Sequence, residues 1–389
     1  MKKRSVALVL TAVIIISLYF AFNKGLFNAF FDVVFLNSSE LTQYAVPESG
    51  KGTGFFRHSY ESLDETGKQA YALILQSVKE HPQRIRIPKL NSEQLNAVFL
   101  ALSYDNPGML CLGSDCRLIS RGGKHYFIPT YSESVDICKA RTLQLEEEVA
   151  KIKAQALEYK GDYEKEKFVH DLIIRNCNYT YDTEKPNVNS AYGAIIQKEA
   201  ACEGYSRAFQ LILAKLDIDV RLVTGKAVDE IEGTVGHMWN MVVLDGDNYF
   251  VDLTWDDPVS QESIIGYSYF NVTGDMIKAT HLQIQPQIEC VAVKHNYFVK
   301  ENRFFNDTDS YFENRVKSAV GYAYSRGEKS IEFRFNSRAT YEAAKEKMIN
   351  GDLIRNAYEL CGLIKKNSGF TLNYSENISA LTFRLYLEA

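Results

Sequence analysis

Two stretches decide the fold of this chain: A-C-E-G-Y-S-R-A-F at residues 201–209, and G-H-M-W-N-M-V-V-L-D-G-D-N-Y-F-V-D-L-T-W-D-D-P at residues 236–258. In the first, apolar residues recur at helical spacing after the cysteine. In the second, two alternating segments flank a D-G turn signal, as in a β-hairpin. We therefore expect a helix beginning at or just after Cys202, followed in sequence by an antiparallel hairpin.

The place of Cys202 at a helix start gives its thiol a chemical advantage. The exposed N–H groups and the dipole of a helix N-terminus favour an anion, and hence the thiolate over the thiol. An isolated free cysteine is nevertheless most often a buried structural residue. Cys202 alone therefore does not establish a nucleophile.

The hairpin has two possible registers, and only one of them brings His237 and Asp252 within reach of each other. If residues 245–246 form a two-residue loop, His237 and Asp252 are diagonal neighbours on one face, within side-chain reach. A loop centred on residues 246–247 would place Asp252 opposite Met241, too far from His237 without a bulge. The turn sequence alone leaves both registers open.

Thiol catalysis needs a base that takes the proton and a carboxylate that orients the base. Cys202, His237 and Asp252 supply these three groups in that order. Each alone would more often be structural, but their combination points to a catalytic triad. A zinc hydrolase is disfavoured because the sequence has no H-E-x-x-H motif.

The three motifs resemble those of the transglutaminase-like superfamily, over about residues 165–275. The resemblance implies an α+β fold with a papain-like core, in which a helix carrying the cysteine packs on an antiparallel sheet carrying the histidine and aspartate. It also implies that Cys202 is the acylated nucleophile, His237 the general base and acid, and Asp252 the residue that orients His237.

The function implied by the resemblance is acyl transfer or hydrolysis at peptide or protein amide bonds through a cysteine thioester. The alternatives are a cysteine peptidase of the same fold and a surface binding module that keeps the fold without turnover. Three further residues are candidates for substrate binding: Tyr192 as a second oxyanion donor, Trp239 in an acyl tunnel or the core, and His281 at the edge of the site. No cofactor and no metal are expected.

The N-terminus indicates a membrane location. Lys2, Lys3 and Arg4 precede residues 5–22, which carry no charge and would span ~27 Å as a helix, close to a bilayer core of ~30 Å. We expect an uncleaved signal anchor of a bacterial surface protein, single-pass, with the catalytic domain extracytoplasmic. A cleaved signal peptide and a buried helix are the alternatives.

The composition indicates which classes of binding partner to expect. The formal net charge of −5 argues against a nucleic-acid binder, and a peptide or protein substrate, such as a cell-wall or surface protein, is expected instead. The oligomeric state is left open. Seven cysteines are present, and Cys111 and Cys116 could pair.

Periodicity divides the chain into five parts. Helical and alternating patterns place small α+β modules on both sides of the central domain. The expected parts are a signal anchor at 1–30, a linker at 31–55, an N-terminal module at 56–132, a transglutaminase-like domain at 133–300 and a C-terminal module at 316–389.

Overall fold

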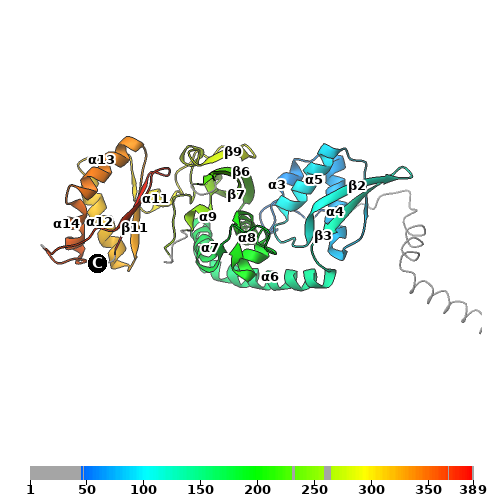
Figure 1. Cartoon of the computed structure of the whole chain (residues 1–389), viewed down its shortest axis with the longest axis horizontal. Helices are drawn as coiled ribbons and strands as arrows, with labels where there is room; N and C mark the ends of the chain where they lie inside the picture. Colours follow the sequence, from blue (N-terminus) through cyan, green and yellow to red (C-terminus); the bar gives the residue numbers. More distant parts are fainter. Residues whose placement is uncertain (1–44, 47, 230–232, 258–263, 367, 388–389) are drawn as a thin grey trace, which may run out of the picture.

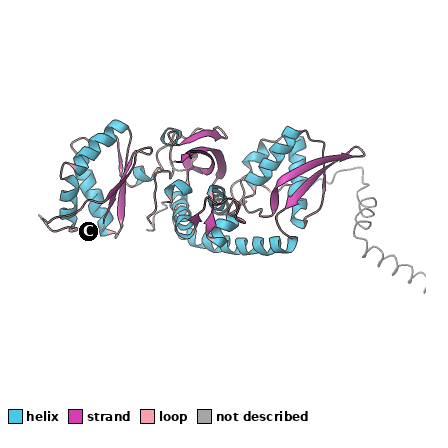
Figure 2. Ribbon diagram, in the orientation of Figure 1, coloured by secondary structure: helices cyan, strands magenta, loops and turns pink. Residues whose placement is uncertain are grey.

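The computed structural model describes residues 45–46, 48–229, 233–257, 264–366 and 368–387. They form an elongated chain of three lobes, each mixing helices with a β-sheet (Figures 1 and 2). The expected α+β fold, with small modules on both sides of a central domain, is confirmed.

The N-terminal lobe packs two helices against a three-stranded antiparallel sheet of order β1-β3-β2. Local sequence sets the helix starts: Asp64 caps α4 by accepting from the N–H of Gly67 (2.7 Å), and Asn91 and Gln94 form a capping box at the start of α5. The elements are α3 His58–Glu61, α4 Glu65–Ser77, η1 Val78–Glu80, β1 Ile85–Ile87, α5 Ser92–Asp105, β2 Leu112–Arg121 and β3 Lys124–Tyr131.

The central lobe holds the functional motifs. Its four-stranded sheet has the order β8-β7-β6-β9, and α8 packs on this sheet with every residue from 204 to 214 buried. A helix that is buried all round is a core helix. The main elements are α6 Val135–Ala156, α7 Asp162–Asn176, η2 Gly193–Gln197, α8 Cys202–Lys215, β6 Val220–Asp229, β7 Gly233–Leu244, β8 Asp247–Val251, α9 Leu253–Asp256, α10 Gly274–Ile277 and β9 His281–Gln285; the shorter β4 Asn178–Tyr179 and β5 Glu199–Ala200 form a parallel pair, and α11 Tyr297–Lys300 follows β9.

The hairpin adopts the first of the two expected registers. Leu244 pairs with Asp247 and Asn240 with Val251, so residues 245–246 are the loop. Asp245 has φ +52° and Gly246 φ +90°, the left-handed values that a tight two-residue turn requires.

The C-terminal lobe is an α+β unit with its own core. Its sheet has the order β10-β11-β13-β12. Arg334 Nη1 donates to the carbonyl of Ser268 (2.6 Å), and Ser268 Oγ bonds Glu332 (2.8 Å), so buried polar contacts fix this lobe to the central one. The elements are β10 Phe304–Phe305, α12 Phe312–Ser325, β11 Ser330–Phe335, α13 Arg338–Ile349, α14 Leu353–Cys361, β12 Tyr374–Asn377 and β13 Thr382–Tyr386.

The disulfide differs from the expected one. Cys111 pairs with Cys138 of α6, with their Cα atoms 6.0 Å apart, and Cys116 is free. The bridge to Cys138 takes up the thiol of Cys111, so Cys111 does not pair with Cys116, which lies further along β2 opposite Pro129 of β3. The bridge instead ties the N-terminal lobe to the long helix α6.

The predicted membrane anchor at residues 5–22 lies outside the described residues. Among the helices of the described part of the chain, none combines the length and the apolar character that crossing a bilayer requires.

Candidate active site

Cys202 is the first residue of α8 and is partly exposed. The N-cap position is occupied by Ala201, which makes no side-chain cap bond. Because the first N–H groups of a helix lack intrahelical partners, this end of α8 keeps its positive character beside the thiol. Gly204 permits the arrangement, since a Cβ there would lie 2.3 Å from the carbonyl oxygen of Val188.

Side chains fix this helix end to the neighbouring strand β7. Ser206 Oγ lies 2.9 Å from the carbonyl oxygen of Cys202 and 3.0 Å from that of Met238. Asn240 Nδ2 donates to the carbonyl of Ser206 (3.1 Å). The helix that carries Cys202 is therefore attached to the strand that carries His237.

His237 and Asp252 are directly bonded. His237 Nε2 lies 2.6 Å from Asp252 Oδ2, and both residues are buried. A carboxylate can only accept, so Nε2 carries the proton of this bond. The other ring nitrogen, Nδ1, is left for Cys202, which interacts with the His237 side chain. The structure thus brings the three predicted residues together in the order Asp252, His237, Cys202.

Asp252 does not continue the return strand as expected. Strand β8 ends at Val251, and Asp252 is the N-cap of the one-turn helix α9. Its Oδ1 accepts from the N–H of Thr254 (3.0 Å), the hydroxyl of Thr254 (2.7 Å) and the N–H of Trp255 (3.3 Å). These capping bonds hold one carboxylate oxygen, so the other is aimed at His237.

His281 lies behind the triad rather than at its edge. Its Nε2 donates to Asp252 Oδ2 at 2.9 Å, the oxygen that also accepts from His237, and the His281 side chain is fully buried. Strand β9 brings it there by pairing Ala227 of β6 with His281. Gly225 of β6 makes room, since a Cβ there would meet the Trp239 ring at 2.8 Å.

The charges of the triad follow from these contacts. Burial disfavours the imidazolium of His237, but the Asp252 carboxylate and the Cys202 thiol outweigh it and raise the pKa of His237 to about 10. Burial opposes the charge of Asp252 as well, yet the two histidines hold the pKa of this carboxyl well below its usual range. Burial lowers the pKa of His281 despite Asp252. At neutral pH the site therefore holds one carboxylate, one imidazolium and one neutral imidazole.

Asp256 anchors the far end of α9. The Asp256 side chain is buried, with 1% of its surface exposed. Asp256 accepts from the N–H of Tyr269 (2.9 Å) and lies 3.3 Å from Nε2 of the buried His170. Asp257 accepts from the Tyr205 hydroxyl at 2.7 Å. With both of its ends bonded, α9 holds Asp252 in place.

Of the other aromatic candidates, Trp239 takes the core alternative, and the Tyr192 hydroxyl is engaged by another side chain. The Tyr192 hydroxyl donates to Gln144 of α6 (2.7 Å), so this hydroxyl is already engaged there. Trp239 is fully buried, and its ring stacks 5.8 Å from that of His237, which makes it a core residue beneath the site. Trp255 is the partly exposed tryptophan, with its ring 6.3 Å from that of His237.

Two groups among the described residues have donor atoms spaced closely enough to hold a metal ion. In Cys111, Glu133 and Cys138, the thiols form the disulfide. The other group is His237, Asp252 and His281, where both Nε2 atoms bond a single carboxylate oxygen. Hydrogen bonds fully account for the second arrangement.

Comparison with known families identifies the central lobe. Residues 151–253 match the model of the transglutaminase-like superfamily, so this part of the chain is a transglutaminase-like domain. No curated protein matches the chain. A domain of this kind supports thiol-dependent acyl transfer or proteolysis in general.

Solved structures give more distant matches. One is described as a candidate cysteine protease from Cytophaga hutchinsonii. It is 12% identical, the match covers 36% of this chain and 61% of that chain, and the TM-score is 0.26. Another is a TGase, at 13% identity, 53% of this chain, 58% of that chain and TM-score 0.26. LapG of Legionella pneumophila matches at 18% identity, 30% of this chain, 75% of that chain and TM-score 0.17. The chain therefore spans about three-fifths of the length of the first two.

Proposed function

We propose that this protein transfers or hydrolyses acyl groups at peptide or protein carboxamides through a thioester on Cys202. The observation that carries the proposal is the 2.6 Å hydrogen bond between His237 and Asp252, with the Cys202 side chain beside His237 at the partly exposed start of α8. The protonated His237 favours the thiolate of Cys202 electrostatically, and the helix N-terminus adds to this effect.

The chemistry follows from those positions. The Cys202 thiolate attacks the carbonyl carbon, and the first N–H groups of α8 accommodate the developing oxyanion. The C–N bond then breaks, and the imidazolium of His237 gives its proton to the departing nitrogen. An incoming amine or water attacks the thioester while His237 takes a proton, which restores the thiolate and the imidazolium.

Asp252 acts throughout by holding His237. Its second oxygen is fixed by α9, so the carboxylate cannot turn away from the imidazole when the proton moves. His281 donates to the same carboxylate from the buried side. Both interactions preserve the orientation in which Nδ1 of His237 faces the thiol.

One assay separates the possible reactions. A protein that begins at residue 31, and so keeps every described helix and strand, is incubated with dimethylcasein and dansylcadaverine. Incorporation of the dansyl amine indicates transfer, ammonia release alone indicates deamidation, and new N-termini indicate proteolysis. Cys202→Ala should abolish whichever product the wild type forms, whereas Cys361→Ala, the matched control at another partly exposed free cysteine, should not. Product formation by Cys202→Ala at the wild-type rate would reject the proposal.

We further propose that the enzyme acts outside the cytoplasm, anchored through residues 5–22. The charged and apolar pattern of residues 2–22 supports this location, and the Cys111–Cys138 disulfide suits an oxidising compartment. Deletion of residues 5–22 should release the protein from membranes. Membrane retention of the deleted form would contradict the proposed anchor.

A further inference from the structure

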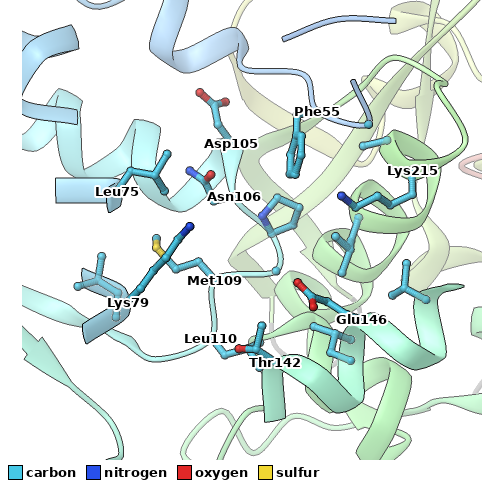
Figure 3. Close-up of a pocket in the computed structure, with 18 of the residues that line it drawn as sticks. Phe55, Leu75, Lys79, Asp105, Asn106, Met109, Leu110, Thr142, Glu146 and Lys215 are labelled. Carbon is cyan, nitrogen blue, oxygen red and sulfur yellow. The ribbon is translucent and has the colours of Figure 1, made fainter. Parts of the chain in front are cut away.

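A hollow lies away from the active site, between the N-terminal lobe and the helices α6 and α8. It encloses about 780 Å³, within the ~300–1,000 Å³ usual for small-molecule sites. Figure 3 shows Leu75, Lys79 and Met109 on one side and Lys215 on the other. Cys202 and Lys215 are the first and last residues of α8, so Lys215 is about 20 Å along the helix from the nucleophile, and Gln210, the first lining residue of α8, is about 12 Å along it.

The walls of this cavity are mainly apolar. They combine side chains from both lobes, so the cavity depends on the packing that the Cys111–Cys138 disulfide reinforces. The principal apolar lining residues are Phe55, Leu75, Met109, Leu110, Val149 and Leu211.

The acidic side chains at the cavity are largely committed to other partners. Glu80 pairs with Lys139 at 2.8 Å. Asp105 accepts from the N–H groups of Ser59 (3.1 Å) and Tyr60 (2.7 Å). Together with Glu146 they are three carboxylates in a lining that has five cationic side chains, those of Arg57, Lys79, Lys139, Lys153 and Lys215.

Positive charge consequently predominates. Lys79, Lys153 and Lys215 line the cavity and form no ion pair with any residue that the structure describes. Among the described residues, Glu146 is the lining carboxylate that likewise forms no ion pair. An apolar cavity with surplus ammonium groups suits a ligand with an apolar body and a negative end.

Lys215 is the best-placed of the three lysines. Its Nζ lies 3.9 Å from the centroid of the Phe55 ring, which holds the ammonium at the cavity wall. Burial lowers the pKa of Lys215, and Glu146 compensates only in part. This ammonium group has therefore lost part of its hydration without gaining a carboxylate partner.

We propose that this cavity binds a free single-chain amphipathic carboxylate of the fatty-acid class. The carboxylate would pair with Lys215, and the aliphatic chain would extend toward Leu75 and Met109 on the opposite wall (Figure 3). The proposal goes beyond the reaction at Cys202 and does not depend on it, because the ligand occupies the other end of α8.

Calorimetric titration with dodecanoate tests the proposal on the protein that begins at residue 31. Lys215→Met, which keeps the length of the side chain and removes its charge, should weaken dodecanoate binding about tenfold, the lower range for a charge-assisted bond. Lys300→Met is the matched control, since Lys300 also lies over an aromatic ring, that of Tyr163, but away from the cavity. Met109→Trp should weaken binding by filling the cavity and serves as a second test if Lys215→Met is poorly folded.

Three further titrations test whether the cavity selects the negative charge of the ligand and the fatty-acid class. Dodecyltrimethylammonium, of equal chain length, should bind at least tenfold more weakly than dodecanoate. Cys202→Ala should bind dodecanoate as the wild type does. Equal binding of the cationic and anionic amphiphiles, wild-type affinity in both Lys215→Met and Met109→Trp, or tighter binding of an apolar peptide with a free carboxyl end would each overturn the proposal.

Discussion

Replacing Asp252 by asparagine removes one charge with almost no change of shape, and the structure indicates that the site cannot tolerate it. Oδ2 accepts from Nε2 of His237 and of His281, and Oδ1 accepts from Thr254 and Trp255. An amide NH₂ group at either position would face donors instead of acceptors. The variant therefore loses the charge and one set of hydrogen bonds together.

The magnitude follows from the pKa of His237. Burial alone would lower this pKa, and Asp252 is the main group that raises it to about 10, against an ordinary value near 6.5. At about 1.4 kcal/mol per unit, the fold favours the imidazolium by about 5 kcal/mol. Without the Asp252 charge, burial should leave His237 neutral at pH 7, and the thiol would lose its cationic neighbour.

The assay is the rate of Cys202 alkylation by iodoacetamide between pH 5 and 9. In the wild type the pKa of about 10 keeps His237 protonated over this range, so the thiol keeps its cationic neighbour throughout. A thiol without a cationic neighbour titrates near ~8.5, so at pH 6 about 0.3% is thiolate. Asp252→Asn, whose thiol lacks that neighbour, should therefore react more than tenfold more slowly than the wild type at pH 6 and gain about tenfold per pH unit up to about pH 8. Coincident pH profiles for the two proteins, with Cys361 as the internal reference, would refute this reasoning.

Three further perturbations test neighbouring parts of the account. His281→Gln, which keeps an N–H donor, should retain most of the alkylation rate at pH 7, whereas His281→Ala should lose about tenfold of it; equal rates would remove His281 from its positioning role. Burial raises the pKa of Glu166 to about 8 despite a hydrogen bond from Asn271. The stability that this carboxyl contributes is thus complete below about pH 4 and lost as pH rises through about 8. Glu166→Gln should therefore raise the free energy of unfolding in urea by up to about 5 kcal/mol at pH 9 and scarcely at pH 4. No gain at pH 9 would contradict this. Replacing both Cys111 and Cys138 by serine removes the disulfide, which joins residues 27 positions apart in the sequence. The free energy of unfolding, measured in urea without reductant, should fall by about 3.5 kcal/mol. Unchanged stability would show that the bridge does not constrain the unfolded chain.

The central motifs could be predicted because their signals are local. Helical spacing after Cys202 and the D-G turn at residues 245–246 require only neighbouring residues. Strand alternation puts His237 and Asp252 on one face in either register, and the structure shows the register that brings them within reach. The resemblance to the superfamily then added the roles of these residues.

The end of strand β8 could have been recognised from a local signal that was missed. An aspartate followed two residues later by threonine is a typical N-cap arrangement, and Asp252 and Thr254 form it. Apolar alternation through Leu253 and Trp255 concealed this signal. Ser206 was also missed, although it lies one helical turn after Cys202, where its hydroxyl can reach back to that carbonyl.

Other features depend on contacts between distant segments. His281 reaches Asp252 only because β9 pairs with β6, and Cys138 reaches Cys111 only because α6 docks beside the N-terminal lobe. Alternation places Trp239 on the same face as His237, but sequence does not show which side chains cover that face. The tertiary arrangement buries Trp239 and leaves Trp255 partly exposed.

The central claim is that His237 activates Cys202, and competitive labelling tests it most directly. The protein that begins at residue 31 is treated with sub-stoichiometric iodoacetamide at neutral pH, and the modified cysteines are mapped by peptide mass. We expect Cys202 to be labelled ahead of Cys116 and Cys361, the other partly exposed free thiols, and this preference to disappear in His237→Ala. Labelling of Cys202 no faster than these two thiols in the folded wild type would contradict an activated nucleophile and favour a binding module instead.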